Sequence, residues 1–89
     1  MGHHNFTNKE LLHIFDLVSS NGHKIQGVWE LQGIRVWHDF DGYTCWLAYK
    51  DLTVTLLFHG KLDVEYDDID TISEFANQCK LLTSELSIS

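Results

Sequence analysis

Apolar and polar residues alternate along the middle of the chain, and the alternation keeps its phase across several turn signals. The clearest turn signal is Asp41-Gly42, because the residues on both sides alternate as hairpin strands do. A two-residue loop at this place sets Trp37 opposite Trp46 in a close, non-hydrogen-bonded pair. The sequence therefore predicts that these two side chains touch.

Three further turn signals flank this hairpin, and no proline interrupts the region. They are Gln32-Gly33, Lys50-Asp51 and His59-Gly60-Lys61. This pattern favours consecutive antiparallel strands over crossover helices. One apolar face persists through every reversal, and its members are Trp29, Leu31, Ile34, Val36, His38, Phe40, Tyr43, Cys45, Leu47, Tyr49, Leu52, Val54, Leu56, Phe58, Leu62, Val64 and Tyr66. We expect a meander of four to five strands, preceded by a short loop over residues 23–27.

Helical spacing appears before the strands, over about residues 8–20. Thr7 and Glu10 form a capping-box pattern, and Phe6 is placed to pack on Leu11. The apolar stripe that follows consists of Leu11, Ile14, Phe15 and Val18. Asparagine and glycine after the last of these indicate the end of the helix.

A second helix is predicted after Tyr66, where acidic residues favour a helix N-terminus and Thr71 with Glu74 could form another capping box. Its stripe is Ile72, Phe75, Cys79, Leu82 and Leu86. Both helices and the sheet have one apolar side each. The expected fold is α+β, an antiparallel meander sheet with an N-terminal and a C-terminal helix packed on one face.

Length and composition indicate one globular domain over residues 1–89, with residues 1–5 and 87–89 frayed. Hydrophobic residues make up 44% of the chain, which suits a dense core in a small domain. The formal net charge is −7, and residues 61–89 hold seven of the acidic residues against two basic ones. Such a field repels phosphate groups, so we expect no direct nucleic-acid or membrane binding and a protein partner instead.

Cys45 and Cys79 are far apart in sequence, and each occupies a position that reads as apolar. Free thiols in the core are the simplest interpretation. We find no apolar segment long enough to span a membrane and no charged-then-apolar leader with a cleavage site. The expected compartment is the reducing cytoplasm.

The sheet face opposite the apolar one is polar except around the tryptophan pair. Trp37 and Trp46, flanked by Val28, Ala48 and Leu57, form an apolar patch there, and Arg35 is placed to stack on a ring. The remaining members of this face are Glu30, Asp39, Thr44, Thr53, Thr55, Asp63 and Glu65. We interpret the patch as a surface for a protein partner or for self-association. The alternatives are that the pair merely stabilises a small sheet, or that a helix covers it.

Two rival functions fit the sequence. The acidic residues could imitate a phosphate backbone, so that the chain would act as a DNA mimic that inhibits a nucleic-acid-binding protein. Alternatively, a small ligand could bind between the helices and the sheet, in a cavity beside His38 and Tyr43. The first predicts salt-dependent binding of a basic protein, and the second predicts the cavity.

Catalytic and metal sites are weakly indicated. Asp63, Glu65, Asp67 and Glu74 follow part of a calcium-loop spacing, but Asp68 stands where glycine is needed. The His3-His4 start resembles a copper or nickel chelator and equally an affinity-tag remnant. His38 should face Cys45 like a base and nucleophile, yet no third group or oxyanion loop accompanies them. We expect no enzyme activity, no cofactor and no metal.

Several motifs together resemble a small bacterial family of uncharacterised proteins, a domain of unknown function. The motifs are a leading helix, Leu31-Gln32-Gly33-Ile34, the distinctive Asp39-Phe40-Asp41-Gly42-Tyr43-Thr44, Leu57-Phe58-His59-Gly60-Lys61 and an acidic final helix. The likeness covers about Glu10 to Leu82. It implies a bacterial, soluble, single-domain protein with no assigned activity and no catalytic residues to transfer.

Overall fold

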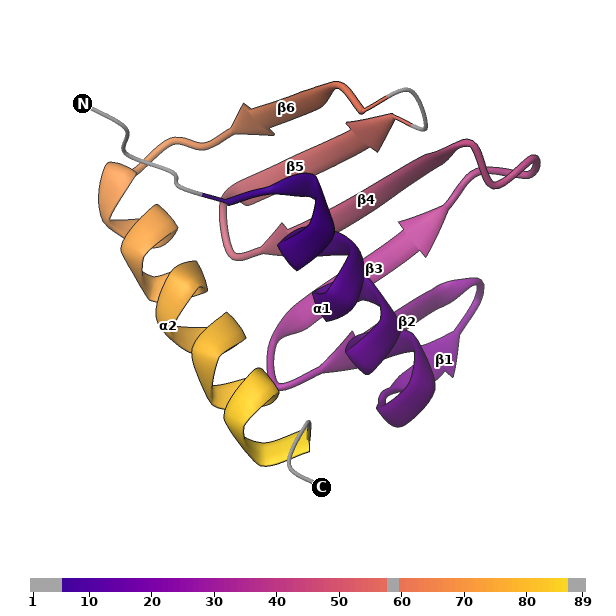
Figure 1. Ribbon diagram of the computed structural model, residues 1–89, viewed down its shortest axis with the longest axis horizontal. Coiled ribbons are helices and arrows are strands. Elements are labelled where there is room, and N and C mark those ends of the chain that lie inside the picture. The colour runs from indigo at the N-terminus through magenta and orange to yellow at the C-terminus, as the bar shows by residue number, and fades with distance from the viewer. Residues whose placement is uncertain (1–5, 58–59, 87–89) are drawn as a thin grey trace.

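The computed structural model describes residues 6–57 and 60–86 and has a six-stranded sheet and two helices. The order is α1 (Asn8–Asn21), β1 (His23–Ile25), β2 (Val28–Leu31), β3 (Ile34–His38), β4 (Thr44–Tyr49), β5 (Leu52–Leu57), β6 (Leu62–Glu65) and α2 (Ile69–Leu86). The strands are antiparallel and neighbour one another in sequence order, and both helices lie on one face of the sheet (Figure 1). The predicted frayed ends, the His3-His4 start, Phe58 and His59 lie outside the described residues.

The α+β meander with both helices on one face is confirmed, but the strand count is six and the loop predicted over residues 23–27 is wrong. Three of those residues form β1, which pairs with β2 through the turn Gln26-Gly27. Both turn residues have positive φ, 52° and 82°, as a type I′ hairpin turn requires. Gln32-Gly33 repeats this geometry at 52° and 86°. A strand of three residues is too short to show an alternating pattern, which is why it escaped prediction.

The Asp41-Gly42 hairpin has the predicted register but a longer loop. Trp37 pairs with Trp46, as expected. The prediction that this pair is non-hydrogen-bonded is wrong, because the Asp39–Thr44 backbone bond and the alternation of pair types make it a hydrogen-bonded pair. The Asp39 N–H donates to the Thr44 carbonyl over 3.0 Å, and the Gly42 N–H closes a turn on the Asp39 carbonyl over 3.1 Å. The loop therefore has four residues instead of two. The register and the two faces of the sheet are as predicted, because the longer loop includes one more residue from each strand and the remaining residues keep their partners.

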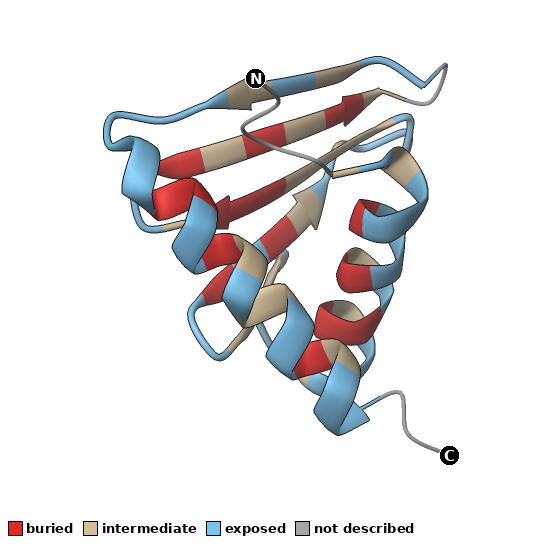
Figure 2. Ribbon diagram, turned by 60° about the vertical axis from the view of Figure 1, so that its left-hand side comes forward, coloured by how far each residue is buried: buried red, intermediate tan, exposed pale blue. Residues whose placement is uncertain are grey.

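The apolar face of the sheet packs under the helices to form the core. Buried and half-buried residues alternate along β5, as the coloured ribbon shows (Figure 2). The core residues are Leu11, Ile14, Leu17, Val18, Ile34, Val36, Leu47, Leu52, Val54, Leu56, Ile72, Phe75 and Leu82. Phe40 and Tyr43 were wrongly assigned to this face. Phe40 is 101% exposed and Tyr43 is also exposed, because both lie in the loop beyond the strand ends.

Helix α1 begins with the predicted capping box. Thr7 Oγ1 accepts from the Glu10 N–H and Glu10 Oε1 accepts from the Thr7 N–H, both over 3.1 Å. These bonds satisfy two backbone donors that a helix start otherwise leaves unpaired. Phe15, predicted within the stripe, lies at its margin against the Trp29 ring, while Leu17 is buried.

Helix α2 does not use the predicted capping box of Thr71 and Glu74. The Asp68 side chain caps the helix instead by accepting the Asp70 N–H over 2.9 Å. Thr71 is buried and donates its hydroxyl to Asp51 Oδ1 over 2.6 Å, while Glu74 pairs with Lys50 over 2.7 Å. Both side chains therefore face the β4–β5 turn instead of the helix start.

Asp51 ties this turn to the start of α2. Its Oδ2 accepts the backbone N–H groups of Asp67 and Asp68, each over 2.8 Å. Together with the Thr71 hydroxyl bond, which contributes most, these bonds lower the pKa of Asp51 from 3.8 to about 2. The carboxylate thus fixes where the helix begins relative to the sheet.

Candidate partner-binding face

The sheet face turned away from the helices, here called the outer face, is left uncovered by both helices (Figure 1). Strand register places six of its residues in one line across the sheet, which we call the central row. Val28 joins the row when the β2–β3 pairing is continued by one residue. The row runs Ile25, Val28, Trp37, Trp46, Thr55 and Asp63. It is apolar from β1 to β4 and polar at β5 and β6.

Trp37 and Trp46 form a stacked pair at the centre of the row. Their ring centroids lie 5.9 Å apart and their planes differ by 13°. Both side chains are half-buried although no helix lies over them. Ala48, on the same face, is only 4% exposed. The rings therefore bury each other and neighbouring outer-face residues while keeping part of their surface in solvent.

A flanking row lies on each side of the central row. The first flanking row is His23, Glu30, Arg35, Ala48, Thr53 and Glu65. The second flanking row is Asp39, Thr44, Leu57 and Lys61. Arg35 lies opposite Glu30 as predicted, but neither makes an ion pair within residues 6–57 and 60–86.

All five residues predicted for partner binding lie on the outer face. Val28, Trp37 and Trp46 are in the central row, Arg35 is in the first flanking row, and Leu57 is in the second. The sequence reasoning missed a sixth residue, Ile25, which lies beside Val28 and is 68% exposed. The signal that could have found it is the dipeptide Gln26-Gly27, which repeats the recognised turn Gln32-Gly33.

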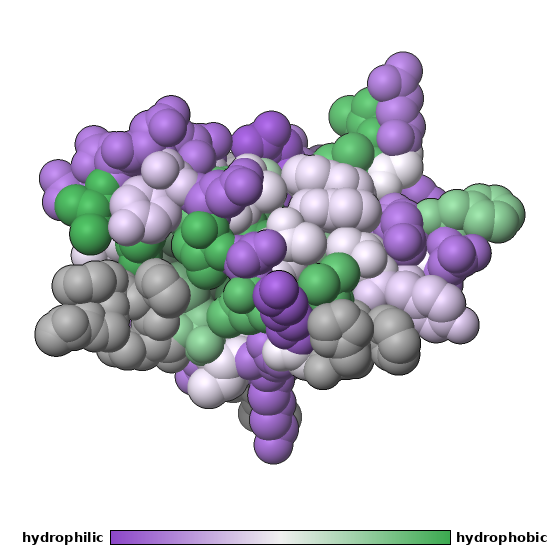
Figure 3. All heavy atoms as spheres, turned by 90° about the horizontal axis from the view of Figure 1, so that it is seen from above, coloured by the Kyte–Doolittle hydropathy of each residue, from purple (hydrophilic) through white to green (hydrophobic). Residues whose placement is uncertain are grey.

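Charged side chains surround the apolar part of the outer face. Figure 3 looks onto the molecule from above Figure 1, where β6 lies uppermost, and this side mixes hydrophilic and hydrophobic residues without one large hydrophobic area. Asp63 and Glu65 on β6 are exposed, and so is Arg35 on β3. The apolar area is therefore local and is concentrated on β1 to β4.

His38 and Cys45 face each other across the hairpin, as predicted. The His38 Nδ1–H donates to the Asp39 carbonyl over 2.8 Å, and the ring lies 5.7 Å from that of Trp29. Burial, with a smaller contribution from the Asp39 charge, raises the pKa of the Cys45 thiol. A raised pKa lowers the thiolate population and opposes nucleophilic chemistry.

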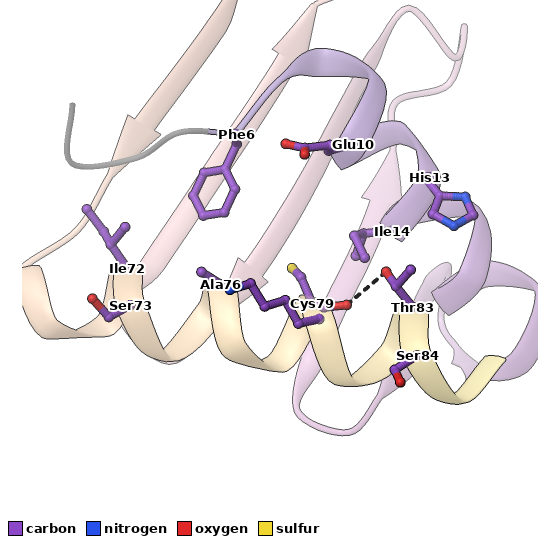
Figure 4. A pocket seen from close by; sticks show the side chains of 11 residues that line it. Phe6, Glu10, His13, Ile14, Ile72, Ser73, Ala76, Cys79, Thr83 and Ser84 are labelled. Atoms are coloured by element: carbon purple, nitrogen blue, oxygen red, sulfur yellow. Dashed lines mark hydrogen bonds between the residues drawn. The ribbon is translucent and has the colours of Figure 1, made fainter. Parts of the chain in front are cut away.

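A groove of about 740 Å³ separates the outer sides of α1 and α2 (Figure 4). Its lining residues are Phe6, Glu10, His13, Ile14, Ile72, Ser73, Ala76, Cys79, Lys80, Thr83 and Ser84. Thr83 donates its hydroxyl to the Cys79 carbonyl over 2.9 Å. Burial and the Glu10 charge raise the pKa of the Cys79 thiol to about 12, so this sulfur stays protonated.

The cavity predicted beside His38 and Tyr43 is found only in part. A hollow of about 290 Å³ is lined by Tyr43 and Cys45, together with Asn8, but not by His38. His38 stands outside because its ring packs against Phe15 and Trp29. The larger space lies between the helices, and its position depends on helix spacing that the sequence pattern does not encode.

Two residues of the calcium-like spacing take part in other interactions. The Glu74 carboxylate pairs with Lys50, and the backbone N–H of Asp67 donates to Asp51. Within the described residues, no group of three or more His, Cys, Asp or Glu side chains is arranged to hold a metal ion. Neither described helix is both long and apolar enough to cross a membrane.

Comparison with known proteins identifies a family but no activity. No curated protein and no solved structure matches the chain. A family described as protein of unknown function (DUF3081) matches residues 6–88. This match covers nearly the whole chain, including both helices and all six strands. The chain therefore belongs to the DUF3081 family of proteins of unknown function.

Proposed function

We propose that this protein is a non-enzymatic binding module whose outer face binds another protein subunit. The observation that carries the proposal is the central row, which leaves Ile25, Val28 and the tryptophan pair on a sheet face that no helix covers. In an antiparallel sheet with one packed face, the free face is normally polar. Apolar side chains gathered there are typical of an interaction surface.

The tryptophan pair has the features of an interface centre. Trp is enriched among the residues that contribute most to binding, especially where a polar rim surrounds it. Trp37 and Trp46 already hold each other in a fixed stack, so little side-chain entropy is lost when a partner covers them. Arg35 and the carboxylates of the flanking rows supply the rim.

The absence of catalysis is part of the same proposal. Both thiols have raised pKa values, Cys79 to about 12, and neither is suited to act as a nucleophile near neutral pH. His38 donates its Nδ1–H to a backbone carbonyl and packs against the Phe15 and Trp29 rings. These roles are structural, and they support binding over chemistry.

Site-specific photocrosslinking tests the proposal. A benzophenone amino acid at Thr55 reports on the outer face, and the same label at Ser73, on α2, reports on the helix side. We expect covalent protein adducts from position 55 in cells that naturally make the protein, and loss of those adducts when Trp46→Ser is added. Adducts from position 73 alone, or adducts indifferent to Trp46→Ser in a folded chain, would refute the assignment.

A second candidate, small-ligand binding, is favoured by the groove between α1 and α2. Its volume of about 740 Å³ lies within the range of small-molecule sites, and Phe6, Ile14 and Ile72 make part of its lining apolar. Ala76→Phe should fill the groove without touching the outer face. A ligand that copurifies with the wild type and is absent from Ala76→Phe, as judged by mass spectrometry, would support this role.

A further inference from the structure

We propose that the partner of the outer face is a second copy of this chain, packed face to face about a two-fold axis that runs along the central row. This inference rests on the proposed function, because it names the occupant of the same face. What carries it is a symmetry in the charges on either side of the central row.

A two-fold axis along the central row exchanges the two flanking rows. On each strand, the residue two positions before the central-row residue would then lie opposite the residue two positions after it on the same strand of the second copy. On β3, Trp37 is flanked by Arg35 and Asp39. Arg35 of one copy would therefore meet Asp39 of the other, and the reverse pair would form as well.

The same relation holds on β6. Asp63 lies in the central row, and Glu65 and Lys61 stand two positions to either side. The axis brings Glu65 of each copy to Lys61 of the other. Two strands thus carry opposite charges at mirrored positions, giving four intermolecular ion pairs per dimer.

The apolar and neutral positions are also compatible with this axis. The apolar members of the central row, Ile25, Val28, Trp37 and Trp46, meet their own counterparts. On β4, Ala48 meets Thr44, and on β5 Thr53 meets Leu57, so no charge is buried against them. At the β6 end of the row, Asp63 lies opposite Asp63 of the second copy. This contact between like charges is at the rim, where water and salt screen it.

Arg35 and Asp39 are available for these pairs. They are four positions apart, which in an extended strand is about 13 Å, so their side chains are too far apart to pair within one chain. Arg35 makes no ion pair in the described part of the chain. Asp39 uses Oδ1 to accept the Gly42 and Thr44 N–H groups, over 2.7 and 3.4 Å, so these bonds fix the carboxylate through only one of its two oxygens. A fixed acceptor reduces the entropy lost on pairing.

Pairing through the β1 edge of the sheet is a poorer solution. β1 has only three residues, and Lys24 is its middle one. A short edge strand with a lysine resists strand addition, because few backbone groups are free and like charges meet. The outer face offers more area: six strands about 4.8 Å apart and about five residues long make roughly 500 Å² in projection. This is below a standard interface, so the dimer should dissociate on dilution.

Charge-swapped chains test the axis directly. Arg35→Glu places Glu against Asp39 twice in its homodimer, and Asp39→Lys places Lys against Arg35 twice. We expect each variant to self-associate about tenfold more weakly than wild type, or worse. An equimolar mixture of the two should associate within about threefold of wild type, since both pairs are then opposite in charge. Sedimentation velocity over a concentration series measures all three.

The second pair and a matched control guard against misfolding. An equimolar mixture of a Lys61→Glu chain and a Glu65→Lys chain repeats the design without changing the Asp41-Gly42 hairpin. This mixture should show the same restored association even if Asp39→Lys unfolds. Lys80→Glu on α2 makes the same charge reversal as Lys61→Glu away from the face, and should leave association unchanged. Circular dichroism confirms that each chain is folded.

Two results would overturn the inference: a wild type that stays monomeric at every accessible concentration, or mixtures of swapped chains that show no rescue. If the chain is monomeric but position 55 still crosslinks to a different protein, the homodimer is refuted and the proposed binding function of the outer face stands. A monomeric chain with no outer-face adducts would remove both.

Discussion

Removing one tryptophan from the stacked pair should destabilise the monomer, and the size of the loss follows from the structure. Trp46 is half-buried without a covering helix, so its buried surface comes from Trp37 and from the sheet beneath. Roughly 120 Å² of buried apolar area at about 25 cal/mol per Å² gives about 3 kcal/mol. We therefore expect Trp46→Ala to lower the free energy of unfolding by about 3 kcal/mol.

A double-mutant cycle isolates the stack from the area that each ring buries alone. Offset-stacked aromatic pairs contribute about 0.5–1.5 kcal/mol beyond burial. Trp37→Ala, Trp46→Ala and the double variant should accordingly show a coupling of about 1 kcal/mol. Urea unfolding followed by far-ultraviolet circular dichroism measures each free energy, at a protein concentration too low for self-association.

Thr55→Ala, in the same row, is the matched control and should change the free energy of unfolding by under about 0.5 kcal/mol. Additive losses for the two tryptophan variants would show that the rings do not pack on each other in solution. A loss under about 1 kcal/mol for Trp46→Ala would refute the burial argument itself. Either result would also remove the fixed stack on which the binding proposal relies.

Three further predictions concern the scaffold. The pKa of Asp51 is lowered from 3.8 to about 2 in the folded chain, so the stability that its carboxylate contributes is complete above pH 3.8 and is lost as the pH falls through about 2. The difference in unfolding free energy between wild type and Asp51→Asn, measured by urea unfolding at each pH, should therefore shrink as the pH falls through this interval. Gln26→Asn should stabilise the first hairpin by about 0.5 kcal/mol, measured as an upward shift in the urea midpoint, because Asn tolerates positive φ better. Phe75→Ala should cost about 3–5 kcal/mol of unfolding free energy, since the ring is fully buried against Phe6 and Tyr49.

The register and the two faces of the sheet could be predicted from the sequence because alternation has a period of two. A loop error of two residues, as at Asp41-Gly42, leaves every strand residue on its face. The start of α2 could not be predicted in the same way. Thr71 and Glu74 fit a capping box locally, but Asp51 and Lys50 bind them from a turn about 20 residues earlier in the chain. Such tertiary contacts override local patterns.

The sequence predicted the central residues of the candidate site but not the residue at its β1 end. Trp37 and Trp46 were found because one turn fixes their pairing. Ile25 was missed because β1 is short, although Gln26-Gly27 has the same sequence as the recognised turn. The groove between the helices depends on the distance between two packed elements, and no short-range pattern reports that distance.

The hairpin motif connects the fold to the proposed interface through one side chain. Asp39 holds the loop by accepting the Gly42 and Thr44 N–H groups, and this same contact orients its carboxylate at the end of β3. The Asp39 side chain therefore acts twice in our proposal, once in the turn and once on Arg35 of the second copy. The turn alone needs only an acceptor oxygen, which Asn would also supply. The negative charge is the part that folding leaves unexplained, and the second copy gives it a role.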